Sequence, residues 1–162
     1  MALLVGPGIG FAHEREVSVR LDRVTVENWE EVIKVDLPPA QWSNVDPASV
    51  LHALCEAQFW PGTSYAIMAG DAAVGYVHFG AIRSGIGWAV AILIIDQHHQ
   101  RRGYGRAAMK LVIEQVRTES PDTTSIWITY RPGNVAAERL YQSLGFEPVG
   151  EHEGDVLAQL TL

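Results

Sequence analysis

The chain has a single cysteine, Cys55, among its 162 residues, so no disulfide can form within it. This excludes the disulfide-stapled secreted domains and favours a reduced, cytoplasmic setting. Basic residues are also few, with 12 Lys and Arg against 19 Asp and Glu and a net charge of -7. An acidic balance argues against nucleic acid as a partner. No apolar run approaches the roughly 20 residues that a membrane-spanning helix needs, so we expect no membrane partner either.

The sequence also lacks a metal-ligand pattern and a leader-like start. Its six histidines form no cluster at metal spacing, and we expect no metal. The apolar stretch at the N-terminus lacks the basic region and the cleavage site of a signal peptide. We interpret residues 1–16 as a flexible extension and residues 17–162 as a single domain, long enough to bury a full core.

The most informative stretch begins with the run from Trp88 to Ile95, which is rich in β-branched residues and predicts a strand buried on both faces. Residues 100–105, QRRGYG, then have the form Q-x-x-G-x-G, and a helical pattern begins near Gly103. The free N–H groups at a helix start, with the positive end of its dipole, favour phosphate. Four basic side chains crowd the same point: Arg101, Arg102, Arg106 and Lys110. A bound pyrophosphate is the predicted ligand.

A second pattern lies further along the chain, in residues 134–146. This segment, NVAAERLYQSLGF, has the form N-x-x-A-x-x-L-Y-x-x-x-G-F. Asn134 can cap a helix at its start, and Gly145 stands at the C-terminal cap. The residues of one helical face between them are apolar: Ala137, Leu140, Tyr141 and Leu144. We therefore expect an amphipathic helix with Tyr141 on its buried face.

These two blocks, with the strand-like segment Ser125 to Tyr130 between them, resemble the GCN5-related N-acetyltransferase (GNAT) superfamily. The Q-x-x-G-x-G turn is similar to the acetyl-CoA-binding motif of that family, and residues 134–146 match its later pattern. The resemblance implies an α/β (α+β) fold with a mixed, mostly antiparallel sheet of six to seven strands. It also implies about four helices on both faces and splayed central strands.

The periodicity of the chain predicts a similar set of elements. The expected strands are residues 18–24, 64–69, 72–80, 88–95, 125–130, 146–149 and 156–162. The expected helices begin at Thr25, at Asp46-Pro47, near Gly103 and at Asn134. In the first of these helices, one face carries Trp29, Val32 and Ile33.

The resemblance implies acetyl-CoA as the co-substrate and assigns its contacts. The pantetheine arm is expected against the main chain of three strand residues: Leu93, Ile94 and Ile95. The pyrophosphate is expected on a run of six consecutive residues: Arg101, Arg102, Gly103, Tyr104, Gly105 and Arg106. Asn134 and Tyr141 are expected near the arm and the thioester sulfur. Tyr141 is the candidate general acid that protonates the leaving thiolate.

No general base is assigned. The strand of residues 88–95 contains no ionisable side chain, although some members of the resembled family carry a glutamate there. Asp96, just past the strand, is expected to brace the turn. His78 would serve only if it pointed into the acceptor cleft, and a core or surface histidine is the more ordinary account.

The acceptor is expected to be a small molecule with a primary amine. Residues 24–29 (VTVENW), the loop around Gln41 and the ending of residues 136–146 are similar to the spermine/spermidine or diamine acetyltransferase subgroup. Charge agrees with a polyamine, because residues 1–99 hold eleven acids and five bases while residues 100–162 hold eight acids and seven bases. Five acids in the first half are candidate amine contacts: Glu30, Glu31, Asp36, Asp46 and Glu56.

Several alternatives stay open. The same fold could serve as a non-catalytic acyl-CoA sensor, because fold does not fix function, and the acceptor could be a peptide or protein N-terminus. Gly103-x-Gly105-x-x-Ala108 also fits the dinucleotide fingerprint G-x-G-x-x-A. However, seven residues separate Ile95 from Gly103, where that fold has almost none. Proteins of the resembled family often dimerise, so a homodimer is among the expected assemblies.

Overall fold

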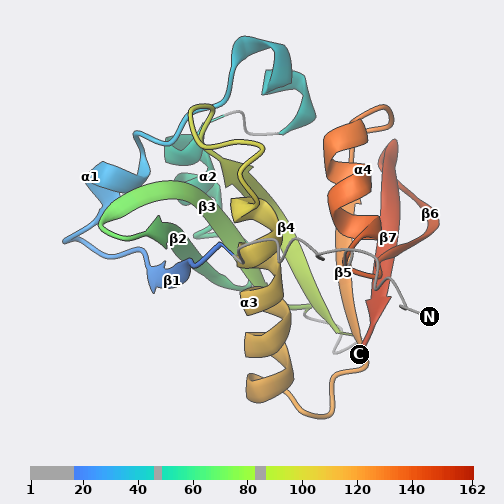
Figure 1. The fold of residues 1–162 in the computed structure, drawn as a ribbon. Coiled ribbons are helices and arrows are strands. Elements are labelled where there is room, and N and C mark those ends of the chain that lie inside the picture. The colour runs from blue at the N-terminus through green and yellow to red at the C-terminus, as the bar shows by residue number, and fades with distance from the viewer. Residues whose placement is uncertain (1–16, 46–48, 83–86) are drawn as a thin grey trace, which may run out of the picture.

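The computed structural model describes residues 17–45, 49–82 and 87–162, and the predicted extension of residues 1–16 lies outside this part. The strands are β1 (Arg20–Arg23), β2 (Thr63–Ala69), β3 (Ala72–Ala81), β4 (Trp88–Ile95), β5 (Ser125–Tyr130), β6 (Glu147–His152) and β7 (Asp155–Thr161). They form a seven-stranded sheet in the order β1-β2-β3-β4-β5-β7-β6 (Figure 1). Neighbours are antiparallel except β4 and β5, which are parallel. The predicted mixed, mostly antiparallel sheet is confirmed.

Helices cover both faces of this sheet. They are α1 (Trp29–Val32), the 3-10 helix η1 (Pro39–Asn44), α2 (Val50–Glu56), α3 (Tyr104–Glu119) and α4 (Val135–Gln142). On one face α3 and α4 pack on the sheet, where Val112 shares a core with Val90 of the central strand. On the other face α1 and α2 bring Val32 and Ala53 against Ile94. Each face of β4 therefore has its own apolar core, as the continuous apolar run predicted.

β4 and β5 are joined over only part of their length. Their parallel pairing joins residues 88–90 to residues 126–128 and then stops. On its other edge β4 carries an extra residue, Ala91, where the register with β3 shifts. A bulge of this kind bends a strand and increases its twist. The predicted splay of the central strands is confirmed. β4 is less buried than predicted, because Ala91, at the splay, is exposed to solvent.

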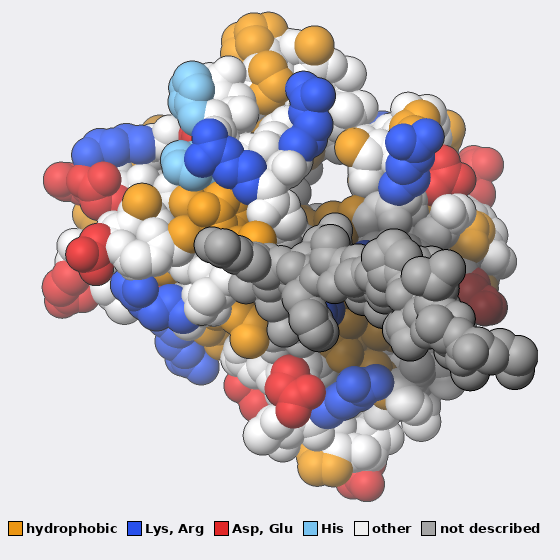
Figure 2. Space-filling model, viewed as in Figure 1, with side chains coloured by type: hydrophobic (Ala, Val, Ile, Leu, Met, Phe, Trp, Pro, Cys, Tyr) orange, Lys and Arg blue, Asp and Glu red, His pale blue; other side chains and the backbone are white. Residues whose placement is uncertain are grey.

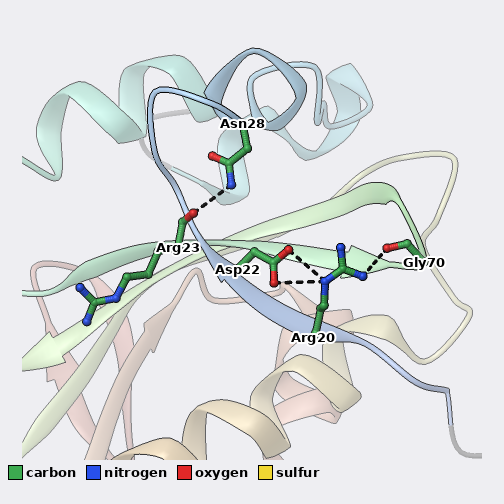
Figure 3. Close-up of polar contacts among 5 residues, drawn as sticks. All are labelled: Arg20, Asp22, Arg23, Asn28 and Gly70. Atoms are coloured by element: carbon green, nitrogen blue, oxygen red, sulfur yellow. Dashed lines mark hydrogen bonds and ion pairs between the residues drawn. The ribbon is translucent and has the colours of Figure 1, made fainter.

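β1 forms one edge of the sheet and is anchored by polar contacts (Figure 3). The Arg20 guanidinium donates to the Asp22 carboxylate (2.9 Å) and to the carbonyl oxygen of Gly70 in the β2–β3 turn. Nδ2 of Asn28 donates to the Arg23 carbonyl (2.9 Å) and so fixes the chain as it leaves the strand. Charged side chains on an edge strand also oppose pairing with a strand of another molecule.

The first helix is shorter than predicted. Thr25 does not cap it; the Thr25 amide donates to Oδ1 of Asn28 (2.8 Å), and Asn28 is the residue that precedes the helix. Trp29 is 39% exposed, and within α1 only Val32 is buried. A single turn cannot present the apolar face that the spacing predicted.

The second helix begins later than predicted. Oγ of Ser49 accepts a hydrogen bond from the His52 amide (3.2 Å), and α2 starts at Val50. The predicted start, Asp46-Pro47, lies outside the described residues. The other predicted strands and helices fall within a few residues of their predicted bounds, and η1, in a segment expected to be a loop, was not predicted.

Candidate active site

The turn between β4 and α3 is held by a buried carboxylate. Asp96, 7% exposed, accepts hydrogen bonds from the His98 amide (2.9 Å), Nδ1 of His99 (3.0 Å) and the Asp36 amide (3.2 Å). Burial by itself raises the pKa of Asp96, but these hydrogen bonds outweigh it and hold the pKa below its usual value. Asp96 therefore braces the turn, as predicted.

Gln100, the first residue of the glycine motif, ties this turn to the loop that carries η1. Its Nε2 donates to the Ile95 carbonyl (3.0 Å) and to Oε1 of Gln41 (2.8 Å), and Nε2 of Gln41 donates back to Oε1 of Gln100 (3.0 Å). The Gln97 amide adds a bond to the Asp36 carbonyl (2.8 Å). The η1 loop and the glycine turn therefore form one braced unit.

The start of α3 presents backbone amides without helical acceptors. Arg101 (φ 59°) and Gly103 (φ 86°) both adopt the left-handed conformation that turns the chain into the helix. The Ala107 amide makes the first bond back to Gly103 (3.0 Å), so the amides of residues 104–106 point out of the helix start. Figure 2 shows a hollow between the start of α3 and α4, with basic side chains on both sides. This geometry suits a bound anion.

The residues predicted to bind acetyl-CoA lie where α3, the end of β4 and α4 come together. A Cβ placed on Gly105 would lie 3.5 Å from Ile95 of β4 and from Leu140 of α4. Leu93 packs into the core of the same face. Ile94 points the other way, into the core under α1 and α2, where it is 1% exposed. Only the main chain of Ile94 is therefore available to a donor on the α3 face.

The basic residues of the turn differ in what they do. Arg101 and Arg102 are exposed, and Tyr104 is half-buried against the α3 core. Nη1 of Arg106 donates to Oγ of Ser143 (2.6 Å), and Nη2 donates to the Ser143 carbonyl (3.2 Å). The Arg106 guanidinium thus links α3 to the end of α4, and its amide is the group left for a phosphate.

Tyr141 lies on the buried face of α4, as predicted, and is 8% exposed. Its ring packs against Tyr130, the last residue of β5, and against Phe146, with 5.8 Å between ring centroids in each pair. Because Tyr130 lies past the point where β5 leaves β4, Tyr141 stands beside the splay. Burial, and then the nearby Tyr130, raise the pKa of Tyr141 to about 12. The hydroxyl is protonated at neutral pH, which is the form that a general acid needs.

Two caps fix the position of Tyr141 along α4. Oδ1 of Asn134 accepts a hydrogen bond from the Ala137 amide (3.2 Å), so Asn134 is the predicted N-cap. At the other end Gly145 has φ 92°, and the Phe146 amide donates to the Tyr141 carbonyl (3.0 Å). Because Oδ1 accepts the capping hydrogen bond, we expect Asn134 to contact acetyl-CoA through its Nδ2 or its main chain.

A cleft of about 1090 Å³ opens at the splay. Its floor is formed by residues 89–92 of β4 and residues 127–129 of β5. One wall is the end of α2 and the segment after it, with Phe59 and Trp60, which are 80% and 64% exposed. The opposite wall is Arg131 and the β6–β7 turn. The cleft lies on the α2 side, across the sheet from the donor residues, where an acceptor could approach a thioester in the splay.

Carboxylates outnumber cations among the described residues that line this cleft. Glu56 of α2 lines one wall, and Glu153 and Asp155 line the other together with Arg131, whose Nη1 donates to Asp155 (3.1 Å). Glu153 and Gly154 have φ of 52° and 88°, as in a tight two-residue hairpin turn. This turn holds Glu153 at the wall, and the cleft favours a cation.

The predicted acidic contacts are corrected by this geometry. Glu56 lines the cleft, but Glu30, Glu31 and Asp36 are not among its described lining residues. Glu30 and Glu31 lie exposed on the single turn of α1, and Asp36 lies in the loop before η1, where its amide donates to Asp96. The fifth candidate, Asp46, lies outside the described residues.

Sequence reasoning missed the aromatic wall and the hairpin carboxylates. Phe59 and Trp60 stand before Pro61-Gly62, a pair that by itself indicates only the end of a helix. Two adjacent large aromatics beside a Pro-Gly turn are poorly placed for a core, and this was the available signal. Glu153 and Asp155 gave no such signal, because only the folded hairpin brings them to the cleft.

The described ranges 17–45, 49–82 and 87–162 contain neither a metal-ligand cluster nor a helix that could span a membrane. Within them no group of three or more His, Cys, Asp and Glu is placed to hold a metal ion. The helices of these ranges are all too short or too polar to cross a bilayer.

The parallel pair that splays, the glycine turn at the helix start and the buried tyrosine together define a class, the acetyltransferases that hold a thioester donor between two strands. Residues 27–146, most of the chain, match the model of the acetyltransferase (GNAT) family. The chain therefore belongs to the acetyltransferase (GNAT) family, whose members are acyltransferases that use acetyl-CoA.

Individual relatives show how far this likeness extends. The [ribosomal protein bS18]-alanine N-acetyltransferase of Escherichia coli (strain K12) is 37% identical over 54 residues, 33% of this chain. The match spans about a third of that relative, 35% of its length. Among solved structures, an acetyltransferase from Thermus thermophilus is 18% identical with a TM-score of 0.70, over 91% of this chain and 99% of that chain.

The aminoglycoside acetyltransferase AAC(6')-Ib, solved in complex with coenzyme A, is 19% identical with a TM-score of 0.71, over 89% of this chain and 95% of that chain. At such identities the likeness establishes the fold. The dinucleotide alternative is wrong, because the sheet has one parallel pair instead of the all-parallel order of that fold.

Proposed function

We propose that this protein transfers the acetyl group of acetyl-CoA to a primary amine of a small cationic molecule, with a polyamine such as spermidine or spermine as the first candidate. The cleft carries this proposal. It opens at the splay on the side away from the α3 start, and carboxylates and aromatic rings line it. Donor and acceptor can thus approach the same point from opposite faces of the sheet.

On the donor side, the amides of residues 101–106 would hold the pyrophosphate. The arm would lie along the β5-facing edge of residues 91–95, which has no strand partner in the described sheet, and pair with it as an added strand does. Tyr141, protonated and beside the splay, would give its proton to the thiolate as the C–S bond breaks.

On the acceptor side, the amine would lie between Glu56 and Glu153, with a charged nitrogen over the rings of Phe59 or Trp60. Single contacts of this kind at exposed sites contribute roughly 0.2–1 kcal/mol each. A polycation can make several of them at once, and this favours a polyamine over a monoamine.

A peptide or protein N-terminus is the second candidate, supported by the name of the relative that is 37% identical over 54 residues. An α-amine, with a pKa of about 8, is neutral more often at physiological pH than a side-chain-like amine of about 10.4. The carboxylate-lined cleft favours the small polycation, because a peptide carries only one charge at its attacking end.

Release of CoA thiol across a panel of amines tests the proposal. The panel contains spermidine, spermine, diamines, an aminoglycoside and peptides that begin with alanine. We expect the highest kcat/KM with a polyamine. Release with the peptide alone would favour the second candidate. Protection of the fold by acetyl-CoA without thiol release from any amine would instead indicate a non-catalytic acyl-CoA sensor.

A further inference from the structure

A buried chain of polar groups runs beneath the acceptor cleft. The Tyr76 hydroxyl lies 2.9 Å from Oγ of Ser64, which lies 3.1 Å from Nδ1 of His78. Tyr76 and His78 are 0% and 3% exposed. The other ring nitrogen of His78, Nε2, is buried; the Pro61 carbonyl lies near the ring, but Nε2 makes no well-formed hydrogen bond with the described residues. A buried polar atom without a partner costs roughly 1–3 kcal/mol, so its presence calls for an explanation.

The position of His78 at the cleft offers an explanation for the buried, unpaired Nε2. His78 lines the cleft and pairs with Ile92 of β4, next to the bulged residue Ala91. Ser64 holds the ring from the β2 side, which leaves Nε2 at the far tip of the ring. Gly62 lies against this tip, where a Cβ would come within 2.8 Å of Nε2. The Gly62 main chain therefore covers Nε2 closely, and any side chain at this position would displace the ring.

We propose that His78 accepts the proton of the acceptor amine, and that Ser64 and Tyr76 are positioning residues that orient its ring. This inference rests on the proposed acetyl transfer. The ammonium group of the acceptor gives one proton to Nε2, and the proton then passes to solvent. The neutral amine forms the C–N bond to the acetyl carbon, and the C–S bond breaks. Tyr141 protonates the thiolate, and the second amine proton restores its hydroxyl.

The protonation state of His78 agrees with this role. Burial lowers the pKa of His78, and the nearby Pro61 carbonyl opposes this to a smaller extent. The ring is therefore neutral at pH 7, the form that accepts a proton. Other titratable or charged groups face the same cleft or the ring: Glu56 from α2, Arg131 after β5, His152, Glu153 and Asp155 at the β6–β7 turn, and Tyr76 beneath.

His78→Gln tests the proposal, with kcat/KM for spermidine measured against pH. We expect a loss of about 100-fold or more, as for removal of a positioned base, and disappearance of the acidic limb of the wild-type profile. Thermal protection by acetyl-CoA should be unchanged, which shows that the variant folds and binds its donor. The matched control is the other histidine that lines the cleft. His152→Gln, at the cleft wall, should keep the acidic limb.

Ser64→Ala provides a second test that does not alter the ring itself. It should lower kcat by about 10-fold and move the acidic limb, with little change in the KM for acetyl-CoA, and it carries the test if His78→Gln does not fold. Wild-type turnover and an unchanged pH profile in both His78→Gln and Ser64→Ala would overturn the role of His78. Loss of the acidic limb in His152→Gln would do the same, and neither result would overturn the proposed acetyl transfer. Absence of wild-type turnover with every amine of the panel would overturn the proposed function and this inference together.

Discussion

Tyr141→Phe removes one hydroxyl and keeps the ring that packs against Tyr130 and Phe146. We expect kcat to fall by about 100-fold or more, the usual loss for a positioned proton donor, while affinity for acetyl-CoA is kept. Tyr130→Phe makes the same chemical change in the neighbouring ring and should retain kcat. Steady-state thiol release measures both variants, and equal activity in the two would remove Tyr141 from the mechanism.

Glu56→Gln tests the charge of the acceptor wall. The Glu56 side chain is 46% exposed, so solvent screens it, and an exposed charge pair contributes roughly 0.2–1 kcal/mol. We therefore expect the KM for spermidine to rise by about 1.4- to 5-fold. Glu30→Gln, a carboxylate on α1 away from the cleft, is the matched control. A KM that changes equally in both variants would contradict a local contact at Glu56.

At the scale of one element, the start of α3 depends on the left-handed conformation of Gly103 (φ 86°). Gly103→Ala introduces strain of roughly 1–2 kcal/mol and a Cβ 3.2 Å from Val17. We expect lower stability and weaker thermal protection by acetyl-CoA. Gly70→Ala introduces positive-φ strain (φ 60°) in the β2–β3 turn, with nothing within 4 Å of the new Cβ. It should lose stability and keep the protection; equal protection in both variants would place the donor elsewhere.

The elements that sequence predicted best are those with a strong local pattern. β4 and β5 have the predicted bounds, because their apolar, β-branched runs end at polar breakers. Both caps of α4 follow from single residues, Asn134 and Gly145. The predicted bounds of α1 were wrong, because a single helical turn is stabilised by its tertiary contacts more than by the periodicity of its own sequence.

The contacts that sequence could not predict join distant residues. The two hydrogen bonds between the side-chain amides of Gln41 and Gln100 join residues 59 positions apart, and no local sequence pattern predicts such a pair. The acceptor cleft could not be predicted for the same reason. Glu56 and Trp60 line one wall and Glu153 lines the opposite wall, and only the folded sheet brings these segments together. Most of the residues predicted to bind acetyl-CoA lie in one short segment, where a local pattern is enough to make a prediction.

At the scale of the whole molecule, the buried His78 makes stability depend on pH. Burial lowers its pKa in the folded state below the unfolded value of about 6.5. Below that pH the unfolded chain binds more protons than the native chain, so the free energy of unfolding falls as pH falls. Calorimetry between about pH 7 and pH 5.5 should show a steeper decline of Tm for the wild type than for His78→Gln. Equal slopes would show that His78 does not stay neutral in the folded protein.

In the proposed reaction, acetyl-CoA on the α3 side of the splay meets a cationic amine on the α2 side. A competition assay tests this most directly. Equimolar spermidine and a short peptide that begins with alanine are incubated together with acetyl-CoA and the protein, and the products are identified by mass spectrometry. We expect N-acetylspermidine as the main product with the wild-type protein and not with Tyr141→Phe. Acetylated peptide as the main product, or no acetylated product at all, would contradict it.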